Sequence, residues 1–292
     1  MEKLSGDIYL IPVLLDDDAV IPEELKHIHV VRASDHDCVS KIEDAIKHQL
    51  QQQGSDIAEA QTLANVRWSH SSYRESWDGL PGYETEFKLV QFTSDKYPKI
   101  GEVTDIIKGT LLESVSSHRS AKLEQNHDTF NFGQEPHART NTWEAFPSEP
   151  KIVGKIISTR YSVHWYGAGA AHPNQFFISF CFLLDPLLRI SDLRNVFANR
   201  DEALSLIQAT VRDQLLYPLP DGDSALSEEW VQEGTADWNA FGTFVFDTDG
   251  VEFSFGPYQV APYAAGPQFA KVPYHILKPR FLPWLRNALN LF

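Results

Sequence analysis

The chain has 292 residues, 42% of them hydrophobic and 12% aromatic, which is enough to fill the core of one large domain or two ordinary ones. A formal net charge of -15 argues against nucleic-acid binding, because proteins contact phosphates mainly through Lys and Arg. Two cysteines are too few for a disulfide framework, and no secretory signal or membrane-spanning apolar run is visible. The sequence therefore predicts a soluble, cytoplasmic protein with no membrane contact.

The first part of the chain has the pattern of an α/β segment. Two strands and two helices are expected there, at residues 7–15, 27–31, 38–50 and 56–67. The first strand is a continuous apolar run, as in parallel strands buried on both faces. His27 and His29 share one face of the second strand, but their spacing matches no strong metal signature. We expect no metal and no cofactor.

This order of elements resembles the last third of a bacterial Toll/interleukin-receptor (TIR) domain. The resemblance rests on Ile11-Pro12-Val13-Leu14-Leu15-Asp16-Asp17, on Ile21-Pro22-Glu23-Glu24-Leu25 and on the helix from Cys38 to Leu50. Complete domains of that family have further strands and a catalytic glutamate upstream, which here would precede Met1. The resemblance thus implies a partial TIR-like segment without NAD-hydrolase activity. Its apolar first strand would otherwise expose an unpaired edge, so we expect residues 1–66 either to pack on the rest of the chain or to self-associate.

Turn-forming residues between Trp68 and Gly82 predict a linker. We therefore divide the chain into a TIR-like segment, a linker and a module, at residues 1–67, 68–82 and 83–292. Within the module, residues 83–150 form a subdomain and 151–292 the main domain. The subdomain is expected to contain a strand at 84–94, a helix at 103–115 and a long polar loop at 125–150.

The main domain has strands and helices in an order typical of an antiparallel α+β architecture. Strands are expected at 151–166 and 175–184, and a helix at 201–216. Asp249-Gly250 favours a tight type I′ hairpin, in which both central residues have positive φ. The predicted fold is thus an antiparallel sheet with packed helices, preceded by the partial α/β segment.

The segment from Gly167 to His172 nearly matches a dinucleotide-binding fingerprint. Pro173 follows where the N-terminus of a helix should hold the pyrophosphate, so we reject that interpretation. The small residues instead favour a tight turn.

The same segment resembles the extracytoplasmic domain of RsiV-type anti-sigma factors. Matching residues are Tyr166 with Gly169-Ala170-Ala171-His172-Pro173-Asn174, Asp249 to Phe255, Tyr258 to Pro267, and Val272-Pro273-Tyr274. The resemblance covers about residues 84–285 and implies a non-catalytic module, since that family binds lysozyme and related modules accompany cell-wall glycan deacetylases. The candidate ligand-binding residues are Tyr166, Gly169, His172, Asn174, Tyr258, Pro262, Tyr263 and Tyr274. The three later tyrosines equally fit a role in closing the core.

Charge suggests the kind of partner. Residues 200–252 contain twelve Asp or Glu against Arg200 and Arg212, which fits either a solvated surface or a field that attracts a cationic protein. Our hypothesis is a sensor fused to a truncated TIR-like signalling segment, in bacterial defence signalling, with a basic protein such as a lysozyme-like muramidase as partner. One alternative is an envelope protein that binds lysozyme or cell-wall glycan. The other is a hydrolase centred on His172, with Asp185 or Asp192 as the orienting carboxylate.

Overall fold

The computed structural model describes residues 13–16, 30–35, 38, 41–42, 61–63, 65–217 and 226–291. The chain divides into two compact units, Met1–Glu59 and Ala60–Phe292. His27, His29 and most of the predicted helix at 38–50 lie outside the described residues.

In the first unit, two short strands are described, β1 (Val13–Leu14) and β2 (Val31–Arg32). They pair in parallel, with Val13 opposite Val31, as the apolar run predicts. Val31 is buried, whereas Val13 is 39% exposed, so the expected burial on both faces does not hold at Val13.

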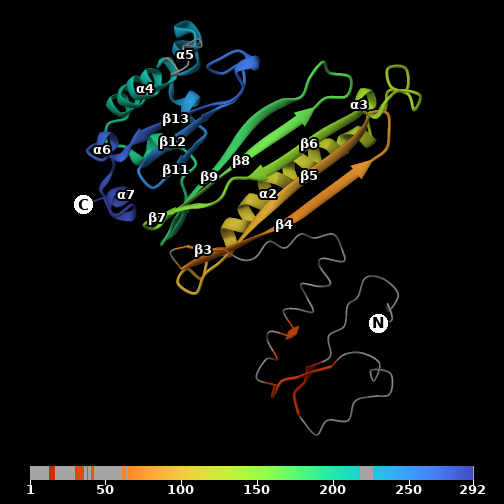
Figure 1. Cartoon of the computed structure of the whole chain (residues 1–292), viewed down its shortest axis with the longest axis horizontal. Helices are drawn as coiled ribbons and strands as arrows, with labels where there is room; N and C mark the ends of the chain where they lie inside the picture. The colour runs from red at the N-terminus through yellow and green to blue at the C-terminus, as the bar shows by residue number, and fades with distance from the viewer. Residues whose placement is uncertain are drawn as a thin grey trace. The chain divides into compact units, whose positions relative to one another are not determined.

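The second unit is built on a large sheet (Figure 1). Its strands are β3 (Gln61–Leu63), β4 (Val66–Trp77), β5 (Gly82–Thr93), β6 (Thr140–Pro147), β7 (Lys151–Val153), β8 (Ile156–Tyr166), β9 (Asn174–Leu184) and β10 (Leu187–Arg189). They follow the order β10-β9-β8-β6-β5-β4-β3, and β7 pairs with β8 next to β6. All neighbours are antiparallel except β5 and β6, which are parallel and are connected through helix α2 (Gly101–His118). The α+β class is as predicted. The sheet was predicted to be antiparallel, however, and the parallel pairing of β5 with β6 differs from that prediction.

Three sequence-based predictions fail in this sheet. Most of the residues assigned to a linker belong to β4 (Val66–Trp77), an edge strand whose polar side chains are mostly half-buried. The expected helix at 56–67 is replaced in its described part by β3 and the start of β4. The long loop at 125–150 contains β6, a central strand that buries Trp143 and Ala145. Each of these segments is rich in polar residues and lacks the apolar periodicity of a buried element, which explains why the strands were not predicted.

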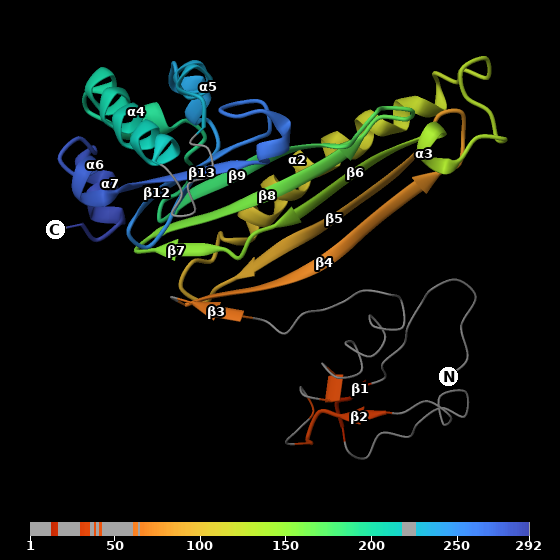
Figure 2. The ribbon, with the colours of Figure 1, turned by 45° about the horizontal axis from the view of Figure 1, so that its top comes forward.

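Helix α2 covers one face of the large sheet (Figure 2). Val103, Ile107, Leu111 and Val115 lie on one side of the helix and are fully buried, as their spacing predicts. They pack against rings and aliphatic side chains of the sheet, including Phe87, Trp143, Tyr161 and Phe180. The predicted strand at 84–94 is also confirmed, as β5.

A smaller sheet packs on the opposite face of the large one, at the end that carries β7 (Figure 2). It consists of β11 (Phe244–Phe246), β12 (Gly250–Phe255) and β13 (Gln268–Pro273), all antiparallel. The helices around it are η3 (Leu193–Val196), α4 (Arg200–Leu216), α5 (Glu228–Gly234), η4 (Trp238–Phe241), α6 (Tyr274–Leu277) and α7 (Pro283–Ala288). Helix α4 confirms the predicted helix at 201–216. No helix in the described part of the chain combines the length and the apolar character needed to cross a membrane.

The hairpin between β11 and β12 is confirmed, but its turn is not of type I′. Neither Asp249 nor Gly250 has a positive φ. Gly250 is required for another reason, because a Cβ there would lie 2.5 Å from the backbone oxygen of Val272 on β13.

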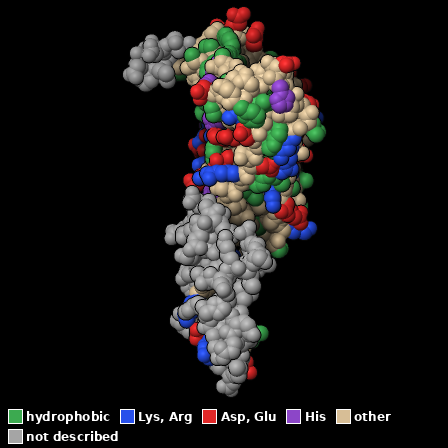
Figure 3. All heavy atoms as spheres, turned by 90° about the vertical axis from the view of Figure 1, so that its right-hand side faces the viewer, with side chains coloured by type: hydrophobic (Ala, Val, Ile, Leu, Met, Phe, Trp, Pro, Cys, Tyr) green, Lys and Arg blue, Asp and Glu red, His purple; other side chains and the backbone are tan. Residues whose placement is uncertain are grey.

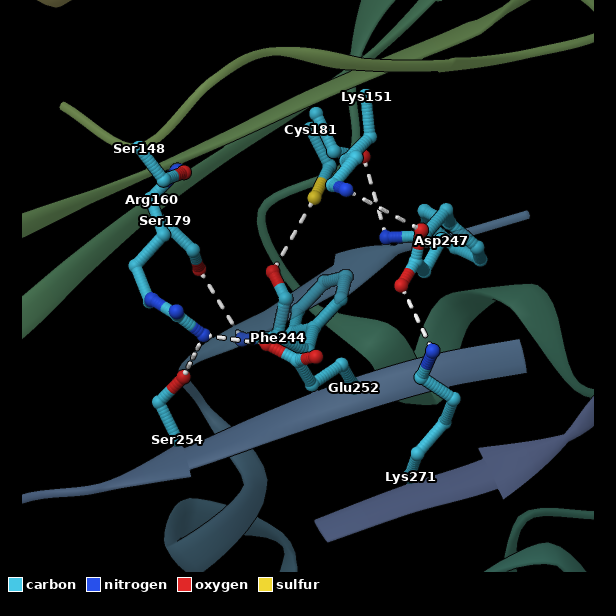
Figure 4. Close-up of polar contacts among 12 residues, drawn as sticks. Ser148, Lys151, Arg160, Ser179, Cys181, Phe244, Asp247, Glu252, Ser254 and Lys271 are labelled. Carbon is cyan, nitrogen blue, oxygen red and sulfur yellow. Dashed lines mark hydrogen bonds and ion pairs between the residues drawn. The ribbon is translucent and has the colours of Figure 1, made fainter. Parts of the chain in front are cut away.

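Side chains of the large sheet satisfy the backbone of β11 (Figure 4). Ser179 Oγ accepts a hydrogen bond from the Phe244 N–H at 3.2 Å, and Ser158 Oγ accepts one from the Phe246 N–H at 3.1 Å. The Cys181 thiol donates to the Phe244 carbonyl at 3.3 Å. Burial raises the pKa of this thiol to about 12, so Cys181 is a structural residue, as its apolar neighbours predict.

Candidate functional site

Two loops that are distant in sequence meet at one end of the small sheet. The first is the β8–β9 hairpin loop, residues 167–173, and the second connects β12 to β13, residues 256–267. The Tyr263 hydroxyl donates a hydrogen bond to the Pro173 carbonyl at 2.7 Å. The ring of Tyr263 contacts both the ring of His172 and that of Tyr258, with centroid distances of 4.3 and 5.6 Å. We call His172, Tyr263 and Tyr258 the aromatic row.

Tyr258 is held in an uncommon backbone conformation. Its φ is 69°, in the left-handed region that costs a bulky residue about 1 kcal/mol or more. A turn stabilises it, with the Tyr258 N–H donating to the Ala261 carbonyl at 3.0 Å. The Gln259 side chain anchors the turn by donating to the Ala240 carbonyl at 2.9 Å. Tyr258 is nevertheless 50% exposed. The strained backbone conformation therefore holds an aromatic side chain in contact with solvent.

The hairpin loop is also fixed by hydrogen bonds. The Tyr166 hydroxyl donates to the Ala170 carbonyl at 2.7 Å, and Gly169 has a φ of 76°, which explains the glycine. The Ala168 N–H donates to Asn141 Oδ1 at 2.9 Å, which ties the loop to β6. His172 Nδ1 lies 2.8 Å from the Pro173 carbonyl oxygen. A rigid loop of this kind loses little conformational entropy when it binds.

Seven of the eight predicted site residues lie on these two loops or directly beside them. Asn174 accepts the backbone N–H of Gln175 through its side chain, and Pro262 precedes the short helix η5 (Tyr263–Ala265). Tyr274 is the exception, because it begins α6 with its ring 6% exposed and its hydroxyl bonded to the Asp247 carbonyl at 2.8 Å. Burial raises its pKa far above the usual value. Tyr274 belongs to the core.

A hollow of about 310 Å³ opens beside the aromatic row. Its lining carries aromatic rings, amides and hydroxyls but no charged side chain: Trp165, Asn174, Gln175, Phe176, Phe177, Thr243, Ser254, Gly256, Pro257 and Gln259. Trp165 and Phe176 are 40% and 39% exposed. We did not predict these two rings. Successive side chains of a strand point to opposite faces of the sheet, so the residues next to Phe176 in the sequence do not lie on its face. The sequence around Phe176 therefore does not indicate an exposed aromatic site.

Arg160 supports the hollow from below. Its guanidinium donates to Glu252 Oε1 at 2.6 Å and to Ser254 Oγ at 2.7 Å, and so joins β8 to β12 (Figure 4). The same guanidinium lies 5.5 Å from the ring centroid of Phe177 and 4.7 Å from that of Phe269. It therefore fixes the ring of Phe177 at the edge of the hollow.

The acidic residues of the predicted stretch are divided between two roles. Glu252 pairs with Arg160, and Asp247 pairs with Lys271 at 2.7 Å, so neither is a free surface charge. The Glu228, Glu229 and Glu233 side chains of α5 are exposed. Helix α5 lies against the Tyr258 turn, because a Cβ on Gly234 would come within 1.9 Å of the Gln259 carbonyl oxygen. By contrast, the end of the unit that carries α3 (Pro136–Arg139) shows acidic, basic and hydrophobic side chains interspersed (Figure 3).

The geometry gives the hydrolase hypothesis no support. Asp185 follows the last residue of β9 and His172 precedes its first, so the 11-residue strand separates them, by roughly 35 Å at the usual rise per residue. Asp185 pairs with Lys155 at 3.2 Å, and Asp192 pairs with Arg194 at 2.7 Å. Among the described residues no group of three His, Cys, Asp or Glu side chains is placed to hold a metal ion.

Comparisons with known proteins identify part of this unit. Residues 194–275 match the model of a family described as a protein of unknown function (DUF3298). A crystal structure of a DUF3298 family member from Bacteroides fragilis NCTC 9343 has the same fold, with a TM-score of 0.50, 14% identity, and coverage of 74% of this chain and 94% of that one. A DUF3298 protein from Pseudomonas aeruginosa PAO1 gives a TM-score of 0.47 at 13% identity, over 74% of this chain and 94% of that one. No curated protein matches the sequence. The RsiV-type and TIR-like resemblances remain predictions.

Proposed function

We propose that the second unit is a non-catalytic module that binds a protein partner through the aromatic row and its surroundings. The observation that carries this proposal is Tyr258, whose exposed ring is held by a left-handed backbone on an anchored turn. Exposed tyrosine rings on rigid loops are typical of binding hot spots, because they contribute a large contact area at a small entropic cost. Strain concentrated at a surface residue also points to function.

The partner we propose is a basic protein such as a lysozyme-like muramidase. The exposed carboxylates of Glu228, Glu229 and Glu233 border the Tyr258 turn and would attract such a protein over a distance of about one Debye length. The resemblance to RsiV-type domains favours the same partner. The alternative ligand, cell-wall glycan, is favoured by the uncharged amide and aromatic lining of the hollow.

For the first unit we keep the proposal of a TIR-like signalling segment that is not an NAD hydrolase, in a cytoplasmic sensor. The support in the described residues is the parallel pairing of Val13 with Val31. Nicotinamide release from NAD by the purified chain, compared with buffer, tests the enzymatic part. Release above the buffer control would contradict it.

Binding of hen lysozyme to the full chain, measured by calorimetry at two ionic strengths, tests the proposed partner. We expect Tyr258→Ala and Tyr263→Ala each to lower affinity by roughly thirtyfold, or about 2 kcal/mol, mainly through faster dissociation. Tyr263→Phe removes only the hydrogen bond to Pro173 and should cost much less. Higher salt should slow association in every variant.

Tyr217→Ala is the matched control, because Tyr217 is a 74% exposed tyrosine at the C-terminal end of α4, outside both loops. The proposal fails for this partner if lysozyme does not bind at low salt. It fails for this surface if Tyr258→Ala and Tyr263→Ala, with their folds intact, bind as well as Tyr217→Ala does.

A further inference from the structure

The outer edge of β9 is only partly covered by another strand. β10 pairs with β9 over Leu184, Leu183 and Phe182, and the Ile190 N–H then donates to the Cys181 carbonyl at 2.8 Å. Beyond Cys181, toward the hairpin loop, no described strand pairs with this edge.

The direction of the free backbone groups follows from the ladder. The pairing of β9 with β8 is continuous from Asn174 to Leu183, and the Cys181 carbonyl points away from β8. In an antiparallel pair the direction alternates, so the backbone groups of Ser179, Phe177 and Gln175 point away as well. The Gln175 carbonyl oxygen lies close to the loop between β12 and β13, because a Cβ on Gly256 would lie 3.4 Å from it.

Of these outward groups, those of Phe177 and the Gln175 carbonyl have no hydrogen-bond partner among the described residues. Gln175 caps its own N–H with the Asn174 side chain at 2.8 Å. No described residue accepts the Phe177 N–H or donates to the carbonyls of Phe177 and Gln175. The same residues line the hollow, which places unpaired backbone groups beside exposed rings.

We propose that this edge binds an extended, uncharged segment of the protein partner, which adds to the large sheet as a strand beside β9. The proposal rests on the proposed function and names the part of the partner that is bound. The unpaired N–H and C=O of Phe177 and the unpaired C=O of Gln175, two residues away, match the repeat of a peptide strand. A sugar offers hydroxyl groups with no such repeat.

The side chains around the edge define the chemistry of the segment. No lining residue of the hollow is charged, although the chain carries a net charge of -15, so a charged segment would lose its hydration without gaining a partner. On an added strand, side chains alternate between the face of Phe176 and the face of Phe177 and Gln175. Apolar side chains fit the first face, and small polar ones fit the second.

Phe177 offers a matched pair of variants. Phe177→Ala removes the ring and keeps the N–H, whereas Phe177→Pro removes both, and a proline is tolerated where the N–H points out of the sheet. We would select linear peptides from a random display library on the full chain and measure their binding to both variants. We expect the selected peptides to be uncharged, and their affinity for Phe177→Pro to be lower than that for Phe177→Ala by roughly tenfold or more.

A second measurement leaves the protein unchanged. In an extended peptide, alternate N–H groups point to opposite edges, and only one edge would pair with β9. Methylating every second backbone nitrogen of a selected peptide should therefore abolish binding when the methylated set faces β9, and not when the other set is methylated. Failure to select any saturable peptide, equal binding to the two Phe177 variants, or competition by chitotetraose without an effect of methylation would overturn the proposal. If lysozyme binding depends on Tyr258 but not on the Phe177 N–H, this inference fails and the proposed function stands.

Discussion

The large sheet has two long strands with unpaired edges, and the two differ in how they are protected. β4 pairs with β3 over Val66 to Trp68, and no other described strand covers its outer edge. Its charged side chains are held in ion pairs, Arg74 with Glu86 at 2.9 Å and Glu75 with Arg119 at 2.6 Å. In β9, the residues from Asn174 to Ser179 include no charged side chain.

Charged side chains along an edge oppose the addition of another strand, because that strand would remove them from water. β4 therefore has the usual protection of an edge strand. β9 has no charged residue and no proline from Asn174 to Ser179, and its register with β8 leaves no room for a bulge. An unprotected edge that lies next to the aromatic row is what a site for a peptide strand requires.

The largest expected effect tests which backbone groups of β9 point outward. Phe176 lies opposite Val163 and points its N–H at β8, whereas Phe177 points away. Phe176→Pro should lose roughly 2–3 kcal/mol of unfolding free energy beyond Phe176→Ala, because it removes a ladder hydrogen bond. Phe177→Pro should lie within about 1 kcal/mol of Phe177→Ala. Urea denaturation measures all four, and equal costs of the two prolines would break the comparison.

A smaller effect is expected at Arg160, which stacks on Phe177 beneath the unprotected edge. Arg160→Met leaves Glu252 without its ion-pair partner, and Glu252 is 26% exposed. We expect a loss of about 2 kcal/mol of unfolding free energy, below the value for a fully buried pair. Adding Glu252→Gln should restore part of it, which a double-mutant cycle measures. No loss in the single variant would mean that packing alone holds the two sheets together.

The sequence predicts the buried elements well and the exposed ones poorly. Helix α2 was predicted because Val103, Ile106, Ile107, Leu111 and Val115 repeat at helical spacing, and all of them except Ile106 are buried. β4 was missed because Ser69, Ser71 and Ser72 are also typical of loops, and only pairing with β5 makes them a strand. Such pairing depends on residues far away in the sequence, which a local pattern does not contain.

The site shows the same division. The aromatic loops were predicted, because tyrosines among Pro and Gly are typical of loops. The error at Tyr274 has a local cause, since Pro273 suggests a loop whereas α6 begins at Tyr274 and turns its ring into the core. The hollow was beyond prediction, because β9 meets the loop at Gly256 only through the packing of two sheets.

The smallest expected effect is a pH dependence at the protected edge. The Glu75 carboxylate on β4 accepts hydrogen bonds from the Arg119 guanidinium and, at 2.6 Å, from the Tyr83 hydroxyl. These bonds, mainly that from Arg119, hold the pKa of the Glu75 carboxyl well below its usual range. A depressed pKa means that the contribution to stability is fully present above the unfolded-state value, about 4.3, and is lost as the pH falls toward the folded-state value.

We therefore expect the urea midpoint of the wild-type chain to fall between about pH 5 and pH 3, and that of Glu75→Gln to fall less. Glu84→Gln is the control, because Glu84 is exposed on the neighbouring strand and forms no ion pair with any described residue. If the urea midpoint of Glu75→Gln depended on pH as steeply as that of the wild type, while that of Glu84→Gln did not, the pH dependence would not come from Glu75. If Glu75→Gln instead made the protein self-associate at neutral pH, charge on β4 would be shown to keep that edge free, as the contrast with β9 requires.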